Sequence, residues 1–83
     1  MIEVRKVIRN DSKQAKKVTI GAGTTEIDYV LNGNGKLIEY ARRSLDKQVL
    51  DDQSLIISPA DYSQAVRTAT AILREKRRKV PTR

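Results

Sequence analysis

The spacing of apolar residues changes near residue 36, and this change separates a strand-like part of the chain from a helix-like part. Before it, apolar and polar residues partly alternate and β-branched side chains are frequent, which is typical of strands. The pattern predicts strands at about residues 2–8, 17–20 and 26–31. The polar loop between the first two is long for a tight hairpin, so we expect these strands to pair, while their register stays open.

Residues 26–31 alternate, with Ile27, Tyr29 and Leu31 on one face and Glu26 and Asp28 on the other, and this period of two favours a third strand. A short helix is the alternative, because Thr25 and Asp28 have the spacing of a capping box. The glycine-rich segment at residues 21–25 breaks the chain in either case. It lacks the Gly-Lys-Ser/Thr ending of a phosphate-binding loop, so we interpret it as a plain turn.

From residue 36 onward the apolar residues recur with the period of a helix. At about 100° per residue, one arc of about 120° holds Leu37, Ile38, Ala41, Leu45 and Val49. This spacing predicts an amphipathic helix at about residues 36–50. A hairpin across Asn32-Gly33 is the alternative, since that dipeptide favours a tight turn between strands. The sustained helical period favours the helix.

The clearest start signal in the chain precedes a second helix, predicted at about residues 59–79. Ser58 is a good N-cap, Pro59 suits the first helical position, and Asp61 suits the positive end of the helix. Pro81 stops the helix. We expect Val66, Ala69 and Leu73 to be buried, as part of an apolar stripe that consists of Tyr62, Ala65, Val66, Ala69, Ile72 and Leu73.

Together these elements predict a small single domain of the α+β class over residues 1–79, with residues 80–83 as a short basic C-terminal tail. The apolar segment at residues 54–58 is either a further strand or a connector. The chain has 83 residues and no Phe, Trp or Cys, so its core is thin and no disulfide reinforces it. We therefore expect a homodimer that shares a core between two copies.

The chain contains no apolar run long enough for a signal-peptide core or a membrane-spanning helix. The absence of cysteine is compatible with a reducing cytosol. We therefore expect a cytoplasmic protein without a membrane partner.

The composition argues against an enzyme. The chain has no His and no Cys, so the commonest general base and the best nucleophile are both missing. Asp51 and Asp52 could hold Mg²⁺, or act with Asp28 or Asp46 as acid and base. Adjacent acids at a helix end more often form a solvated turn. We expect no catalytic residue, no metal and no cofactor.

The three tyrosines allow two interpretations. Tyr29 and Tyr40 could stack on nucleic-acid bases, as aromatic residues do on single-strand-binding surfaces. The scattered positions do not match an RNA-recognition sheet, which concentrates its aromatic residues on two central strands. Tyr62 lies on the apolar stripe of the second helix. We therefore interpret all three as core or boundary residues.

The net charge of +7 is concentrated at the two ends of the chain, around a nearly neutral middle. This distribution is the usual footprint of a polyanionic partner. We predict a small basic nucleic-acid-binding accessory protein that contacts the phosphate backbone of DNA or RNA. The expected contacts are Arg67, Arg74, Lys76, Arg77, Arg78 and Lys79 from the second helix, and Arg5, Lys6, Arg9, Lys13, Lys16 and Lys17 from the N-terminal hairpin.

Other interpretations of the basic C-terminus stay open. It could dock an acidic protein surface, which would make the protein a non-enzymatic interaction or structural component of a larger assembly. The dipole of a helix also favours basic side chains in its last turn, but six basic residues within 74–83 exceed that need. The eight residues at 51–58 are too many for the turn of a helix-turn-helix, so reading of bases is not implied.

Overall fold

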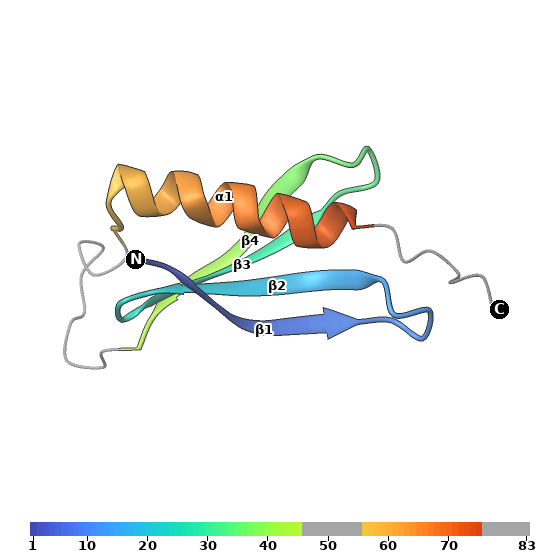
Figure 1. Cartoon of the computed structure of the whole chain (residues 1–83), viewed down its shortest axis with the longest axis horizontal. Coiled ribbons are helices and arrows are strands. Elements are labelled where there is room, and N and C mark those ends of the chain that lie inside the picture. Colours follow the sequence, from blue (N-terminus) through green and yellow to red (C-terminus); the bar gives the residue numbers. More distant parts are fainter. Residues whose placement is uncertain (46–55, 76–83) are drawn as a thin grey trace, which may run out of the picture.

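A computed structural model describes residues 1–45 and 56–75 of the chain. Four strands form one antiparallel sheet in sequence order, and one helix lies across a face of that sheet (Figure 1). The elements are β1 (Glu3–Arg9), β2 (Ala15–Ala22), β3 (Thr25–Leu31), β4 (Leu37–Ser44) and α1 (Pro59–Arg74). The prediction of a small single α+β domain is confirmed, but the described residues hold four strands and one helix, which differs from the expected count.

The predicted helix at residues 36–50 is wrong over its described part, because residues 37–44 form strand β4. The Asn32-Gly33 hairpin is correct, and β4 pairs with β3. A β-bulge explains the misleading pattern: Asp28 lies opposite Ala41 and Tyr29 opposite Glu39, so Tyr40 is an extra residue. The alternation therefore shifts by one residue halfway along the strand, and the apolar positions take on a helical spacing.

The strands predicted at residues 2–8 and 26–31 are confirmed as β1 and β3, and the one predicted at 17–20 is the middle of the longer β2. The alternative of a short helix capped by Thr25 is wrong. Gly23 and Thr24 join β2 to β3, and Gly23 adopts a φ of 64°, which glycine tolerates best. Gly23 and Thr24 therefore form a hairpin turn, whereas Gly21, Ala22 and Thr25, which we also assigned to the turn, lie in the strands.

Helix α1 begins as predicted, because the Ser58 hydroxyl accepts a hydrogen bond of 3.1 Å from the backbone N–H of Asp61. The expected end near residue 79 is wrong, since α1 ends at Arg74 and Glu75 is extended, with a ψ of 120°. The Gln14 side chain donates to the Leu73 carbonyl at 3.1 Å, which satisfies one of the terminal carbonyls.

The core lies between α1 and the central strands, β2 and β3. Val18, Ile20, Ile27 and Tyr29 on the sheet meet Ala65, Ala69 and Leu73 on the helix, and all seven are at most 3% exposed. Small alanines at two of the helix positions let the helix approach the sheet closely. Ala69 and Leu73 are buried as expected, whereas Val66 is only partly buried, so that expectation is wrong.

The other tyrosines do not belong to the core. Tyr62 is 42% exposed at the edge of α1, and Tyr40 is 65% exposed on β4, so Tyr29 is the one tyrosine whose core assignment holds. Ile56 and Ile57 are described as a connector without regular structure, and Ile57 packs against the core.

Several predictions fall outside the described residues. They concern the acidic residues Asp46, Asp51 and Asp52, the apolar Val49, and the basic residues Lys76, Arg77, Arg78 and Lys79. Within the described ranges, no helix is long and apolar enough to cross a membrane.

Candidate nucleic-acid interface

The face of the sheet opposite α1 carries most of the polar chemistry of the described chain, and no described element covers it (Figure 1). Since side chains alternate along a strand, the strand register shows which residues have their side chains on this open face. It contains Lys6 and Ile8 of β1, Lys17, Thr19 and Gly21 of β2, Glu26, Asp28 and Val30 of β3, and Ile38, Ala41 and Arg43 of β4. The face divides into two halves of different character.

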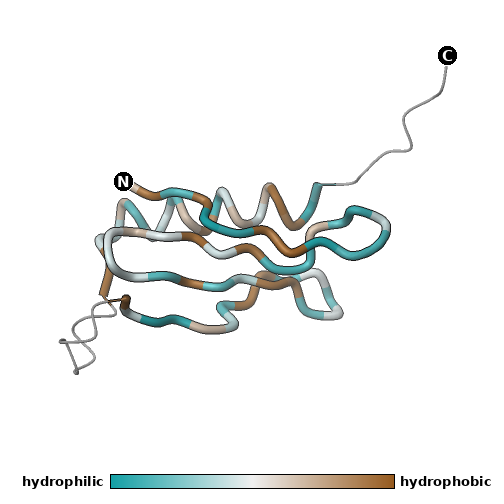
Figure 2. Tube along the Cα trace, turned by 90° about the horizontal axis from the view of Figure 1, so that it is seen from below, coloured by the Kyte–Doolittle hydropathy of each residue, from teal (hydrophilic) through white to brown (hydrophobic). Residues whose placement is uncertain are grey.

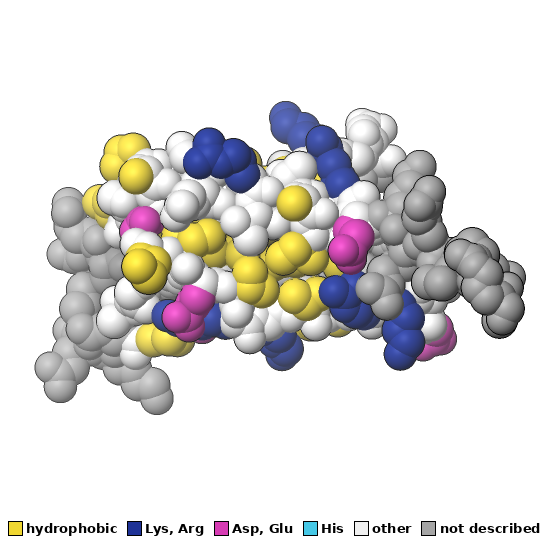
Figure 3. All heavy atoms as spheres, in the orientation of Figure 1, with side chains coloured by type: hydrophobic (Ala, Val, Ile, Leu, Met, Phe, Trp, Pro, Cys, Tyr) yellow, Lys and Arg dark blue, Asp and Glu magenta, His cyan; other side chains and the backbone are white. Residues whose placement is uncertain are grey.

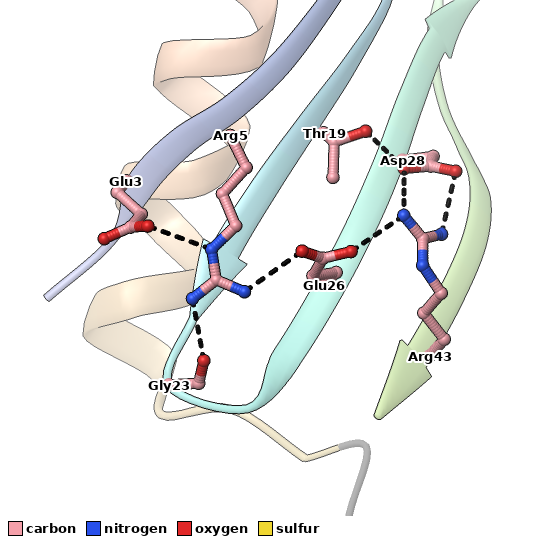
Figure 4. Close-up of polar contacts among 7 residues, drawn as sticks. All are labelled: Glu3, Arg5, Thr19, Gly23, Glu26, Asp28 and Arg43. Atoms are coloured by element: carbon pink, nitrogen blue, oxygen red, sulfur yellow. Dashed lines mark hydrogen bonds and ion pairs between the residues drawn. The ribbon is translucent and has the colours of Figure 1, made fainter. Parts of the chain in front are cut away.

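The half near the Gly23 turn is an ion-pair network, shown in Figure 4. Arg5 is the extra residue of a bulge in β1, and its guanidinium lies against Gly21. There it pairs with Glu3 at 3.0 Å and Glu26 at 3.1 Å, and donates to the Gly23 carbonyl at 2.8 Å. A side chain at position 21 would overlap this guanidinium, so the glycine makes room for the arginine.

Arg43 continues the network on the other side of Glu26, which it contacts at 2.9 Å. It also donates two hydrogen bonds to Asp28, at 3.0 and 3.2 Å, while the Thr19 hydroxyl donates to the same carboxylate at 2.7 Å. Burial by itself raises the pKa of Asp28, but the bonds from Arg43 and Thr19 outweigh it and hold this pKa below its usual value. We call Glu3, Arg5, Thr19, Glu26, Asp28 and Arg43 the ion-pair half.

The other half of the open face lies towards the loops at residues 10–14 and 32–36 and has a different composition. The Lys17 ammonium lies 5.5 Å from the centre of the Tyr40 ring, across β3. Apolar side chains lie beside this pair on three strands, and the Asp28 carboxylate of the ion-pair half interacts electrostatically with Lys17. We call Ile8, Lys17, Val30, Ile38 and Tyr40 the tyrosine half.

Both of these loops lie at one end of the sheet, beside the last turn of α1 (Figure 2). Arg74 donates to the Gly35 carbonyl at 3.0 Å, which ties the helix to the second loop. A pocket of about 410 Å³ opens between these parts, lined by Gln14, Ala15, Lys16, Leu31, Asn32, Gly33, Gly35, Leu73 and Arg74. We call this region the two-loop end.

The two-loop end gathers lysines that were widely separated in the sequence. Lys13 lies in the first loop, Lys16 is a bulge residue of β2, and Lys36 lies in the second loop. None of these three lysines, and neither Lys6 nor Lys17, makes an ion pair with another described residue. The positive charge of this end is therefore not neutralised by ion pairs within the described residues.

The arginines among the expected contacts are placed less favourably for binding a nucleic acid than these lysines are. Arg5 is held by two carboxylates, and Arg9 lies 3.9 Å from Glu75 while it donates to the Lys13 carbonyl. Arg74 belongs to the two-loop end, whereas Arg67 lies exposed two turns earlier on α1, on the opposite side of the sheet from the open face. The structure therefore brings Lys13, Lys16 and Arg74 together at the two-loop end, places Lys17 on the adjoining open face, and separates Arg5 and Arg67 from them.

Two residues of this region are absent from the predicted contacts. Lys36 and Tyr40 were both assigned to a helix, so neither was placed on a sheet. The Asn32-Gly33 dipeptide was the signal that could have found them, because a hairpin there puts Lys36 in its loop and Tyr40 on its second strand.

The described residues contain no group of three or more His, Cys, Asp or Glu that could hold a metal ion. The chain matches no protein-family model, and no curated protein sequence or solved structure is significantly similar to it. The functional assignment therefore rests on the geometry of the open face and of the two-loop end.

Proposed function

We propose that this protein is a small non-catalytic nucleic-acid-binding protein that contacts the phosphate backbone with the lysines of the two-loop end. The observation that carries the proposal is the unequal pairing of its cations. Arg5, Arg42 and Arg43 are paired with carboxylates, whereas Lys13, Lys16, Lys17 and Lys36 make no ion pair within the described residues.

Unpaired lysines at one end of a domain suit a phosphate backbone. An ammonium group on a flexible stem acts as a point charge, and it needs no fixed geometry to meet a phosphate oxygen. Contacts of this kind hold a nucleic acid without reading its sequence. The basic residues Lys76, Arg77, Arg78 and Lys79 follow closely after α1, which ends at this same region, and we include them among the contacts.

A salt titration tests the proposal. Fluorescence anisotropy with single-stranded DNA, duplex DNA and RNA of mixed sequence should show binding that weakens steeply as salt rises. The triple variant Lys13→Gln, Lys16→Gln, Lys36→Gln should flatten the slope of log K against log salt by about 2 units on a single strand and by about 2.7 on a duplex. Arg67→Gln is the control, and it should leave the slope within about half a unit of the wild type.

Two results would contradict the proposal. The first is no binding of any nucleic acid at low salt, which would favour an acidic protein as the partner. The second is an unchanged slope in the triple variant, which would exclude the two-loop end as the contact surface.

We further propose that the protein is cytoplasmic and that it self-associates. Exposed apolar side chains support the self-association. Val4 and Ile56 are 43% and 63% exposed. Figure 3 shows hydrophobic side chains gathered along the line between α1 and the neighbouring strands. Exposed apolar area of this kind is typical of surfaces that associate with another chain.

A further inference from the structure

The tyrosine half of the open face contains an aromatic ring that the fold does not use. Tyr40 is 65% exposed and does not belong to the core cluster. It is the extra residue of the β4 bulge. A bulge of this kind redirects a side chain, and here the contact with Lys17 places the ring over the open face. An exposed aromatic ring held in this way gives the fold little stability and offers a flat apolar surface to a ligand.

The surroundings of the ring match the two parts of a nucleotide. Ile8, Val30 and Ile38 make the neighbouring surface apolar, which suits the face of a base and does not suit a phosphate. Lys17 lies 5.5 Å from the ring centre, which is close enough for one nucleotide to meet both residues. These five residues include no carboxylate, and Asp28, which interacts electrostatically with Lys17, has its charge offset by hydrogen bonds from Arg43 and Thr19.

We propose that the tyrosine half binds an unpaired nucleotide, with its base stacked on Tyr40 and its phosphate at Lys17. The inference rests on the proposed function and narrows it, because stacking on a protein ring requires a base that is not enclosed in a duplex. The preferred ligand is therefore a single strand. Every base has a flat face, so the preference does not depend on sequence.

The other exposed tyrosine provides a matched control. Tyr62 on α1 is 42% exposed, and the Arg42 guanidinium lies 6.0 Å from its ring centre. It therefore has a similar cation contact, but on the helix side of the sheet and among different neighbours. If any exposed tyrosine beside a cation sufficed for stacking, the two residues would behave alike.

The experiment compares Tyr40→Leu, Tyr40→Phe and Tyr62→Leu by anisotropy with a single strand and with a duplex of the same length. Tyr40→Leu should weaken single-strand binding on the order of tenfold, because it removes one base–aromatic stack. Duplex affinity and the salt slope should stay as in the wild type. Tyr40→Phe should restore single-strand binding, and Tyr62→Leu should not change it.

A modified ligand gives a second readout that needs no protein variant. A single strand with abasic positions keeps every phosphate but lacks the bases, so wild-type affinity for it should fall to that of Tyr40→Leu for the intact strand. Full affinity of Tyr40→Leu for the intact strand, or equal weakening on strand and duplex, would overturn the stacking while leaving the backbone contacts in place. Absence of any binding by the wild type would instead overturn the proposed function itself.

Discussion

The two halves of the open face lie on the same strands but use their positive charges in opposite ways. In the ion-pair half, Arg5 and Arg43 are held by Glu3, Glu26 and Asp28 at 2.9–3.1 Å for their closest contacts. In the tyrosine half, Lys17 has an aromatic ring as its neighbour and makes no ion pair with a described residue. One half bonds its cations to carboxylates of neighbouring strands, and the other holds a lysine that we propose as a phosphate contact.

The division follows the chemistry of the two cations. A guanidinium is planar and donates from a rigid fork, so it bonds two oxygens in fixed positions. Arg43 does so with Asp28, a carboxylate that is only 5% exposed. An ammonium group loses little when its partner moves, which suits the phosphates of a flexible strand. The kind of cation thus distinguishes the structural half from the proposed binding half.

The largest expected effect comes from removing Arg43. Arg43→Met keeps the aliphatic stem but leaves Thr19 as the remaining described hydrogen-bond donor to the buried Asp28 carboxylate, so the free energy of unfolding should fall by about 2 kcal/mol. Urea unfolding at neutral pH measures this change. Arg67→Met is the control, because Arg67 is exposed and pairs with no described residue, and its effect should stay within about 0.5 kcal/mol.

Arg43→Met also tests whether the ion-pair half takes part in the binding that we propose for the tyrosine half. Folded Arg43→Met should bind a single strand within about twofold of the wild type, since Arg43 makes none of the proposed phosphate contacts. If Arg43→Met instead weakened single-strand binding as much as Tyr40→Leu does, the ion-pair half would belong to the binding surface.

A smaller effect is expected at Gly21, where the Arg5 guanidinium occupies the place of a side chain. Gly21→Ala should displace Arg5 and break its bond to Glu26, which costs about 1 kcal/mol. In an Arg5→Ala background the same change should stabilise the strand by about 0.5 kcal/mol, because alanine restricts the unfolded chain. The effect of alanine on the unfolded chain is common to both backgrounds and cancels, so the double-mutant cycle should give a coupling of about 1 kcal/mol. If the effects of Gly21→Ala and Arg5→Ala were additive, the absence of a side chain at Gly21 would not be needed for the position of Arg5.

The smallest expected effect is on the stability of the protein at acidic pH. The pKa of Asp28 is lowered in the folded protein from an ordinary value of 3.8, so the network contributes stability above that pH and loses it as the pH falls towards the folded pKa. The wild type should lose more stability than Asp28→Asn between about pH 6 and about pH 3, as measured by urea unfolding at each pH. Asp11→Asn, which removes a loop carboxylate outside the network, should keep the acid loss of the wild type. An equal loss in wild type and Asp28→Asn would place the acid sensitivity elsewhere.

The parts of the fold that could be predicted are those that depend on neighbours in the sequence. The Ser58 cap and the alternation at residues 26–31 are local signals, and both identified the correct element. The segment at residues 37–44 was misassigned because the bulge at Tyr40 interrupts its alternation, and a bulge is recognised only when the partner strand is known.

The candidate site shows the same limit. The excess of basic residues near Lys13 and Lys16 was visible in the sequence, but which cations are neutralised depends on strand register. Arg5 and Glu26 are 21 positions apart and meet only because β1 and β3 both flank β2. The contrast between paired arginines and unpaired lysines is therefore a property of the folded sheet, not of the composition.

The bulges have a further consequence for the two outer edges of this sheet. β1 and β4 are its two outer strands, and each carries one bulge, at Arg5 and at Tyr40. An outer strand with a regular row of free N–H and C=O groups is a template on which other chains add, and a bulge interrupts that row and twists the strand away. The two residues that give the open face its character also disrupt the regularity that intermolecular sheet growth requires. The same two irregularities of the backbone thus shape the surface chemistry of the open face and interrupt the outer edges of the described sheet.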